Sequence, residues 1–217
     1  MNKSPINRGT MTKAILDGYI GIKFQAICMD KKLPAPGEEY KTSFKENGLR
    51  LLHYNMAPAN GGNMSTRFEK GFLITASGCN LGCVEDDEVV YVEEFSLENK
   101  LVKYRGCCPP SSETFLHGLL YNEKADILSV IHAHDIAATS MNLSGLLDET
   151  EREEPYGTVE LAQLCLETFR KGNDIIVLKN HGYVAIGASL TNAADIIINM
   201  HHHLLQLKKK DARMSLL

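Results

Sequence analysis

The sequence contains no long hydrophobic run and no excess of positive charge. No apolar stretch reaches the roughly 18 residues of a membrane-spanning helix, and the opening residues, MNKSPINRGTMTKAIL, lack the apolar core of an export signal. The chain carries 23 Lys and Arg against 27 Asp and Glu, a net charge of −4, and its basic residues are dispersed apart from those at 208–210. We therefore expect no membrane association and no nucleic-acid partner.

Regularly spaced cysteine pairs are also missing. Cys79 and Cys83 form a CxxxC pair, but no second pair of suitable spacing follows, as a cysteine-ligated zinc site would require. In a chain without an export signal such thiols stay reduced. We therefore expect a cytoplasmic protein whose six cysteines form no disulfides.

Repeats, low-complexity segments and linkers are absent, which predicts one domain over residues 1–217. Helices are expected over 12–29 and from Ser43 to Tyr54, the second with Ser43-x-x-Glu46 as a capping box and with Gly48 lowering its helix propensity. Later helices should begin near Ser111, Thr158 and Asn192, and strands are expected at 64–68, 71–75, 89–95, 101–105, up to His134, 174–178 and 183–186. This order indicates a mixed, largely antiparallel sheet flanked by helices.

The stretch SVIHAHD at 129–135 ends an apolar run with two histidines. In an extended strand, side chains i and i+2 leave the same face, so His132 and His134 point the same way. His181 lies in an Asn-His-Gly turn between two apolar strands, which can bring it beside neighbouring strand ends. Three neutral imidazoles with an open fourth position are the usual arrangement of a catalytic zinc site. The alternative is that each histidine is satisfied locally.

Ser111-Ser112-Glu113 opens a helix after a Pro-Pro pair. Serine suits a helix N-cap, and Glu113 suits the positive end of the helix dipole, so a structural role alone can explain these residues. Helix N-termini also bind phosphate through their free N–H groups. The glycine-rich loop at 60–65 and the turn at 75–78 could supply further backbone donors.

Taken in order, five short motifs resemble the class II aldolase/adducin family. They are Gly62-Asn63-Met64-Ser65, Thr75-Ala76-Ser77-Gly78, Ser111-Ser112-Glu113, His132-Ala133-His134 and Asn180-His181-Gly182. The separation between Glu113 and His132 also agrees with the family. The resemblance implies a single three-layer α/β/α domain that usually forms a homotetramer with its sites between subunits.

The resemblance also implies the chemistry of the site. His132, His134 and His181 would hold a divalent ion, most often Zn²⁺, with Co²⁺ or Mn²⁺ as substitutes, and the ion would stabilise an enediolate. Glu113 would move the proton as acid and base. The positions that match the family's site for the substrate phosphate are Asn63, Ser77, Gly78, Ser111 and Ser112.

The chain departs from the family between His134 and His181, which are closer in sequence here than in the family's aldolases. The missing stretch is about where some members supply a tyrosine proton donor from a neighbouring subunit. Tyr156 is a candidate substitute or a structural tyrosine, and we assign it no donor role. His117, four residues after Glu113, could orient that residue, although a packed histidine is the plainer explanation. The run at 201–203 receives no role, because consecutive helical residues point in different directions.

These residues predict a lyase with a small phosphorylated sugar as its substrate. The favoured reaction is cleavage of a ketose phosphate to dihydroxyacetone phosphate and an aldehyde. A methylthioribulose-1-phosphate dehydratase is the alternative, because it uses a similar metal triad and glutamate. A ribulose-5-phosphate 4-epimerase is less favoured, since that subgroup typically has aspartate where Glu113 stands. A non-catalytic adducin-like binding module would not need the three histidines.

Overall fold

The computed structural model describes residues 21–135, 143 and 145–214. The described strands are β1 (Gln25–Asp30), β2 (Asn63–Phe68), β3 (Gly71–Thr75), β4 (Val89–Ser96), β5 (Leu101–Arg105), β6 (Ser129–Ala133), β7 (Asp148–Glu149), β8 (Ile175–Leu178) and β9 (Gly182–Gly187). They form one sheet in the order β1-β5-β4-β3-β2-β6-β9-β8-β7. The β1–β5 and β7–β8 pairs are parallel, and the other neighbours are antiparallel. The prediction of a mixed, largely antiparallel sheet is confirmed.

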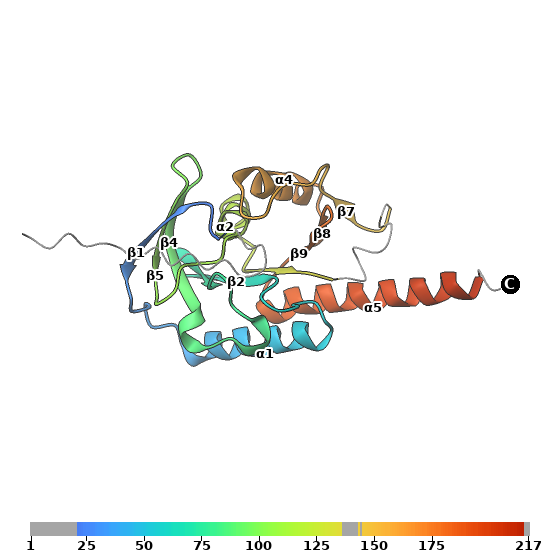
Figure 1. Cartoon of the computed structure of the whole chain (residues 1–217), viewed down its shortest axis with the longest axis horizontal. Helices are drawn as coiled ribbons and strands as arrows, with labels where there is room; N and C mark the ends of the chain where they lie inside the picture. Colours follow the sequence, from blue (N-terminus) through green and yellow to red (C-terminus); the bar gives the residue numbers. More distant parts are fainter. Residues whose placement is uncertain (1–20, 136–142, 144, 215–217) are drawn as a thin grey trace, which may run out of the picture.

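Helices cover both faces of this sheet (Figure 1). α1 (Glu38–His53) and α5 (Leu190–Met214) pack on one face, and α2 (Thr114–Glu123) and α4 (Val159–Phe169) pack on the other. The strands serve both cores because successive side chains leave opposite faces: in β6, Val130 joins the α2–α4 core and Ile131 joins the α1–α5 core. The three-layer arrangement implied by the family resemblance is therefore observed.

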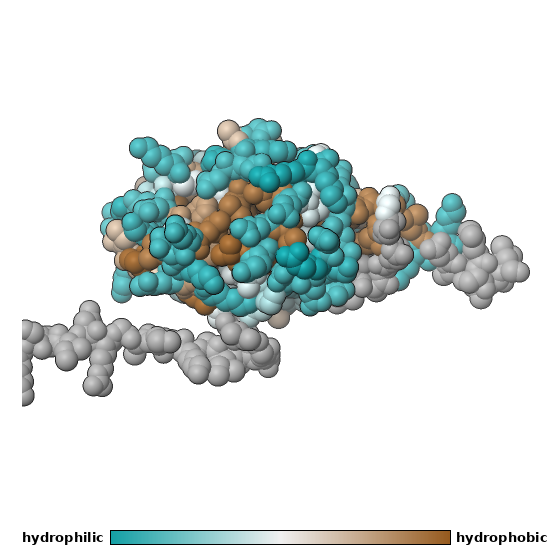
Figure 2. Space-filling model, turned by 90° about the horizontal axis from the view of Figure 1, so that it is seen from above, coloured by the Kyte–Doolittle hydropathy of each residue, from teal (hydrophilic) through white to brown (hydrophobic). Residues whose placement is uncertain are grey.

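The outer side of the α2–α4 layer is mostly hydrophilic, with a hydrophobic stretch in its middle (Figure 2). α5 extends beyond the edge of the sheet (Figure 1). None of the helices in the described ranges has the length and apolar character needed to cross a bilayer.

The expectations for the N-terminal helices need correction. Residues 25–29 lie in strand β1 rather than in a helix, because pairing with β5 at the sheet edge overrides local propensity; residues 12–20 lie outside the described residues. The second helix begins at Glu38, with Gly37 as its N-cap, so Ser43 lies inside α1 and forms no capping box. Glu38 and Glu39 mark the start of this helix in the sequence, because their negative charges suit the first turn of a helix.

Later boundaries also differ slightly from expectation; for example, the last helix, α5, begins at Leu190 rather than at Asn192. α2 starts at Thr114 with Glu113 as its N-cap, three residues after the predicted start at Ser111. Strand β6 ends at Ala133, so His134 follows the strand directly.

Gly48 brings α1 unusually close to the short 3-10 helix η1 (Leu81–Cys83). A Cβ atom at this position would lie 1.9 Å from the backbone oxygen of Leu81. The glycine that weakens the helix by propensity is therefore the residue that permits this packing.

We expect Gly48→Ala to lower the free energy of unfolding by about 1–3 kcal/mol, the usual cost of an overpacked core position, although alanine favours helix. Glu46→Ala, on the exposed side of the same helix, is the control and should change stability by less than about 0.5 kcal/mol. Denaturant unfolding measures both. An unchanged or raised stability for Gly48→Ala would show that α1 and η1 separate easily.

Candidate metal centre and phosphate pocket

Three histidines converge where β6 ends beside the β8–β9 hairpin. β6 pairs with β9, so the loop that precedes β9 lies next to the end of β6. His181 is in that loop, and its backbone N–H donates to the backbone carbonyl of Leu178 at 2.9 Å. Asn180 supports the tight turn with a φ of 57°, a left-handed conformation that asparagine tolerates.

The imidazoles of His132, His134 and His181 face one another. Their ring centroids are 4.7 to 4.9 Å apart, and one nitrogen from each ring lies within 4.8 Å of the others. His132 is fully buried, and the other two are half-buried. The Nε2 atoms of His132 and His134 lie 2.8 Å apart.

The ring of His132 has a defined tautomer. Its Nδ1 lies 2.8 Å from the carbonyl oxygen of Tyr183, which can only accept, so Nδ1 carries the proton. The Nε2 lone pair therefore points toward His134 and Glu113. Burial, followed by the charge of the neighbouring imidazoles, lowers the pKa of His132 well below its usual range and also lowers that of His134. Neutral imidazoles with converging lone pairs suit a divalent cation.

Glu113 lies beside these rings with a carboxylate that is almost fully buried. Its Oε2 accepts a hydrogen bond of 2.7 Å from Nδ2 of Asn63 and lies 3.4 Å from Nε2 of His132. Its Oε1 is buried and has no hydrogen-bond partner among the described residues. An unpaired buried carboxylate oxygen is costly, so this atom fits a site that a cation or a substrate hydroxyl completes.

A pocket of about 130 Å³ opens beside the triad. Its lining includes Glu113, His134 and His181, together with four of the five residues expected to bind phosphate: Asn63, Gly78, Ser111 and Ser112. The fifth, Ser77, does not line the pocket, although its neighbours Ala76 and Gly78 do. The structure thus brings the expected metal ligands, Glu113 and four of the five expected phosphate residues into one region, and Ser77 stands in sequence between two lining residues.

Backbone pairing holds the phosphate-side loops together. The backbone N–H of Ser111 donates to the carbonyl oxygen of Thr75 at 3.1 Å, and the backbone N–H of Ser77 donates to the carbonyl oxygen of Pro109 at 2.9 Å. The 75–78 turn is thereby fastened to the segment that leads into α2. Gly62 closes the other side: its φ is +83°, and a Cβ there would lie 2.6 Å from the carbonyl oxygen of His132.

Comparison with known proteins decides the family. Residues 46–206, most of the chain, match the family model described as Class II Aldolase and Adducin N-terminal domain. The chain belongs to the class II aldolase and adducin family. Class II aldolases are metal-dependent lyases that typically use zinc, and the histidine triad is a group that could hold such an ion.

Relatives within the family include more than one activity. An L-fuculose phosphate aldolase of Methanocaldococcus jannaschii is 31% identical over 166 residues, which are 70% of this chain and 87% of that protein. A methylthioribulose-1-phosphate dehydratase of Pseudoalteromonas translucida is 30% identical over 171 residues, which are 67% of this chain and 79% of that protein. A solved L-fuculose 1-phosphate aldolase superposes with a TM-score of 0.67 at 26% identity, covering 81% of this chain and 88% of that one.

In this class II aldolase-family chain, sequence reasoning named Tyr156 as a candidate but missed Lys23. Tyr156 lines the pocket, and Lys23 lies over it, with Nζ 4.6 Å from the ring centroid and 2.5 Å from the Tyr156 carbonyl oxygen. Burial lowers the pKa of the Lys23 ammonium, and the negative charge of Glu113 opposes that shift. Lys23 is 133 positions from Tyr156 in sequence, so no local pattern could reveal this pair.

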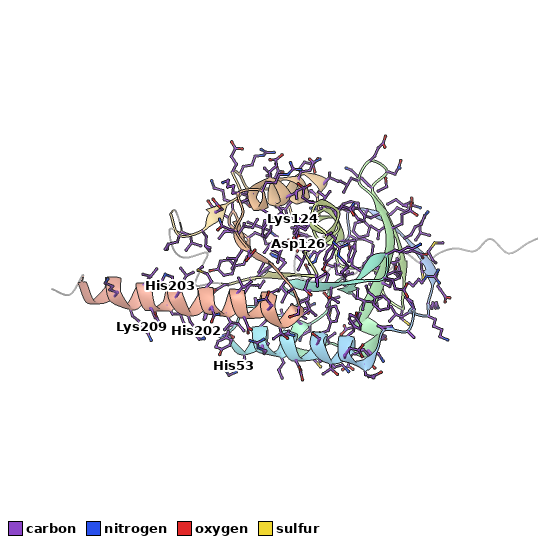
Figure 3. The ribbon with its side chains drawn as sticks, turned by 180° about the vertical axis from the view of Figure 1, so that it is seen from behind. His53, Lys124, Asp126, His202, His203 and Lys209 are labelled. Carbon is purple, nitrogen blue, oxygen red and sulfur yellow. The ribbon has the colours of Figure 1, made fainter. Side chains whose placement is uncertain are left out.

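The histidines at 201–203 lie on α5 and line no part of this pocket. His201 pairs with Asp135, with Nδ1 2.8 Å from Oδ2. His202 and His203 are exposed on α5 (Figure 3).

We expect purified protein to retain about one divalent ion per chain, as a three-histidine site does. His132→Ala, His134→Ala and His181→Ala should each lose most of it, because a two-histidine remnant binds metal weakly. His203→Ala, which removes an exposed histidine, is the control and should keep the metal. Elemental analysis after dialysis measures the content. Undiminished metal in the three triad variants would contradict the assignment.

Proposed function

We propose that the protein is a metal-dependent aldolase that reversibly cleaves a ketose 1-phosphate into dihydroxyacetone phosphate and an aldehyde. The observation that carries the proposal is the buried Glu113 carboxylate, which has one unpartnered oxygen between the histidine triad and the start of α2. The similarity to the Methanocaldococcus jannaschii L-fuculose phosphate aldolase supports this reaction class.

In this proposal His132, His134 and His181 hold the ion, Zn²⁺ or, by availability, Co²⁺ or Mn²⁺. When bound, the ion supplies Lewis-acid stabilisation of negative charge on the substrate oxygens. Oε1 of Glu113 takes a proton from the carbon beside the carbonyl of dihydroxyacetone phosphate, which leaves an enediolate to attack the aldehyde. In cleavage the same oxygen returns the proton. Asn63 holds Oε2, which leaves Oε1 directed to the substrate.

The substrate phosphate would bind where α2 begins. Ser111 and Ser112 line the pocket here, and the free N–H groups and positive dipole end of a helix favour an anion. Lys23, stacked on Tyr156 at the pocket wall, adds a positive charge on this side. Asn63 and Gly78 complete the proposed contacts, and Ser77 acts by shaping the turn that carries Gly78. The substrate phosphate and the base Glu113 would then both lie at the N-terminus of α2.

Three further expectations stay predictions within this proposal. They are a single domain over residues 1–217, a homotetrameric assembly and a cytoplasmic location. Size measurement by light scattering tests the assembly.

We expect Glu113→Gln to lower kcat by about 10²- to 10⁴-fold, because the amide keeps size and hydrogen bonding but cannot act as a base. Metal content should persist, since Glu113 is not a proposed ligand. Glu160→Gln is the matched control, because Glu160 is an exposed acid in the first turn of the neighbouring helix α4. Ordinary turnover by Glu113→Gln would show that Glu113 serves only the helix dipole.

A methylthioribulose-1-phosphate dehydratase is the second candidate. The Pseudoalteromonas translucida relative of that name is 30% identical over two thirds of this chain. The same triad and glutamate would serve its first step, because dehydration also begins with proton removal beside a carbonyl. The two reactions differ in the next bond to break, carbon–carbon in the aldolase and carbon–oxygen in the dehydratase.

Product analysis on metal-replete protein separates the two. We expect incubation with dihydroxyacetone phosphate and small aldehydes to yield a ketose 1-phosphate with a new carbon–carbon bond, and Glu113→Gln to form almost none. Water loss from methylthioribulose 1-phosphate without any aldol adduct would assign the dehydratase. Inactivity toward both substrate sets, in protein with full metal content, would overturn the proposed function.

A further inference from the structure

A buried chain of hydrogen bonds runs from Tyr121 to Glu113. Oη of Tyr121 lies 2.7 Å from Oγ of Ser65, which lies 2.6 Å from Nδ1 of His117. Nε2 of His117 lies 2.5 Å from Oδ1 of Asn63, and Nδ2 of Asn63 lies 2.7 Å from Oε2 of Glu113. All five side chains are at most 5% exposed, so water does not compete for these contacts.

Two facing elements build this chain. Asn63 and Ser65 are at positions i and i+2 of β2 and so leave the same face of the strand. Glu113, His117 and Tyr121 follow at intervals of four along α2 and so share one helix face. The backbone N–H of His117 donates to the carbonyl of Glu113, but the His117 ring is linked to the Glu113 carboxylate through the Asn63 amide.

The hydrogen bonds run in one direction. A carboxylate only accepts, so the Asn63 NH₂ group donates to Glu113 and its Oδ1 must accept from Nε2–H of His117. A neutral imidazole with the proton on Nε2 has a lone pair on Nδ1, which accepts from the hydroxyl of Ser65. Ser65 in turn accepts from Tyr121. Burial lowers the pKa of His117 to about 4, which keeps the ring neutral.

The opposite orientation of the Asn63 amide would bring its Oδ1 against the Glu113 carboxylate. Two acceptors at 2.7 Å repel each other in a buried site, where no water screens them. An asparagine alone can turn its amide over at little cost, because the two ends have the same shape. His117 prevents this turn, since its Nε2–H requires an oxygen opposite it.

We propose that His117 is a positioning residue: it fixes the Asn63 amide with its N–H toward Glu113 and thereby directs Oε1 of Glu113 into the pocket. The inference rests on the proposed function, because it concerns the carboxylate proposed as the base. The Asn63 amide has two N–H donors, and only one goes to Glu113. The same orientation therefore also leaves a donor for a substrate on the pocket side, which Asn63 lines.

A spectroscopic test needs no enzymatic activity. In full-length protein with ¹⁵N-labelled histidine, NMR at neutral pH should show His117 as the Nε2–H tautomer, with its signal assigned by its loss in His117→Gln. The more usual structural role of a packed histidine imposes no particular tautomer. The Nδ1–H tautomer or a charged ring would overturn the proposal. A wild-type protein inactive on both candidate substrates, yet with the Nε2–H tautomer, would contradict only the proposed function.

A matched pair of variants tests the effect on turnover. The amide nitrogen of glutamine reaches the place of Nε2, so His117→Gln keeps the donor to Asn63. The shorter His117→Asn replaces only Nδ1, so it keeps the contact with Ser65 and loses the contact with Asn63.

The variants are compared on the substrate that the wild type turns over. We expect His117→Asn to lower kcat at least about tenfold, because it loses the hydrogen bond that orients the Asn63 amide toward the Glu113 carboxylate. His117→Gln keeps that hydrogen bond and should stay within about threefold of the wild-type kcat. Metal content should be equal in both. Equal losses in the two variants, or no loss in His117→Asn, would reduce His117 to a packing residue. If His117→Asn does not fold, the tautomer decides.

Discussion

The pairing of β6 between β2 and β9 is the contact on which the site depends. In this register Asn63 of β2 lies opposite His132, and His132 lies opposite Val184 of β9. A slip of one residue would turn every side chain of β6 to the other face of the sheet and would remove His132 from the histidine triad. The apolar residues of β6 resist that slip because Val130 and Ile131 already belong to different cores.

Several buried polar side chains lie beside β6, and most of their polar atoms have hydrogen-bond partners. The carbonyl of Tyr183 uses one nitrogen of His132, and the chain through Asn63 and His117 uses one oxygen of Glu113. What remains near the site is a set of converging imidazole nitrogens and the unpartnered Oε1 of the neighbouring Glu113. Leaving such groups unpaired costs about 1–3 kcal/mol each in an apo protein. A cation and an anionic sugar derivative together would relieve that cost, which is a physical reason for the proposed chemistry.

Sequence reasoning succeeded where local geometry decides position. The i, i+2 rule placed His132 and His134 on one face, and the Asn-His-Gly turn brought His181 beside them. It failed where distant contacts decide: residues 25–29 lie in strand β1 rather than in a helix because β5 lies next to them. The role of His117 needed the structure as well. Its four-residue spacing suggested a direct contact with Glu113, whereas β2 inserts Asn63 between them.

Under the proposed function, a division between the centre and the rim of the pocket would account for the presence of both aldolases and dehydratases among the relatives. The triad, Glu113 and the start of α2 would act on the carbonyl end of a sugar phosphate, and that part of the substrate is common to both reactions. The bond that breaks next would lie farther from the carbonyl, and Tyr156 is a further residue of the pocket lining. Tyr156 comes from the segment between β7 and α4, and Lys23 anchors it from a distant part of the chain. In the proposed function the rim could therefore change while the β6 register and the buried hydrogen-bond chain stay intact, and the choice of reaction would rest on residues that the sheet does not constrain.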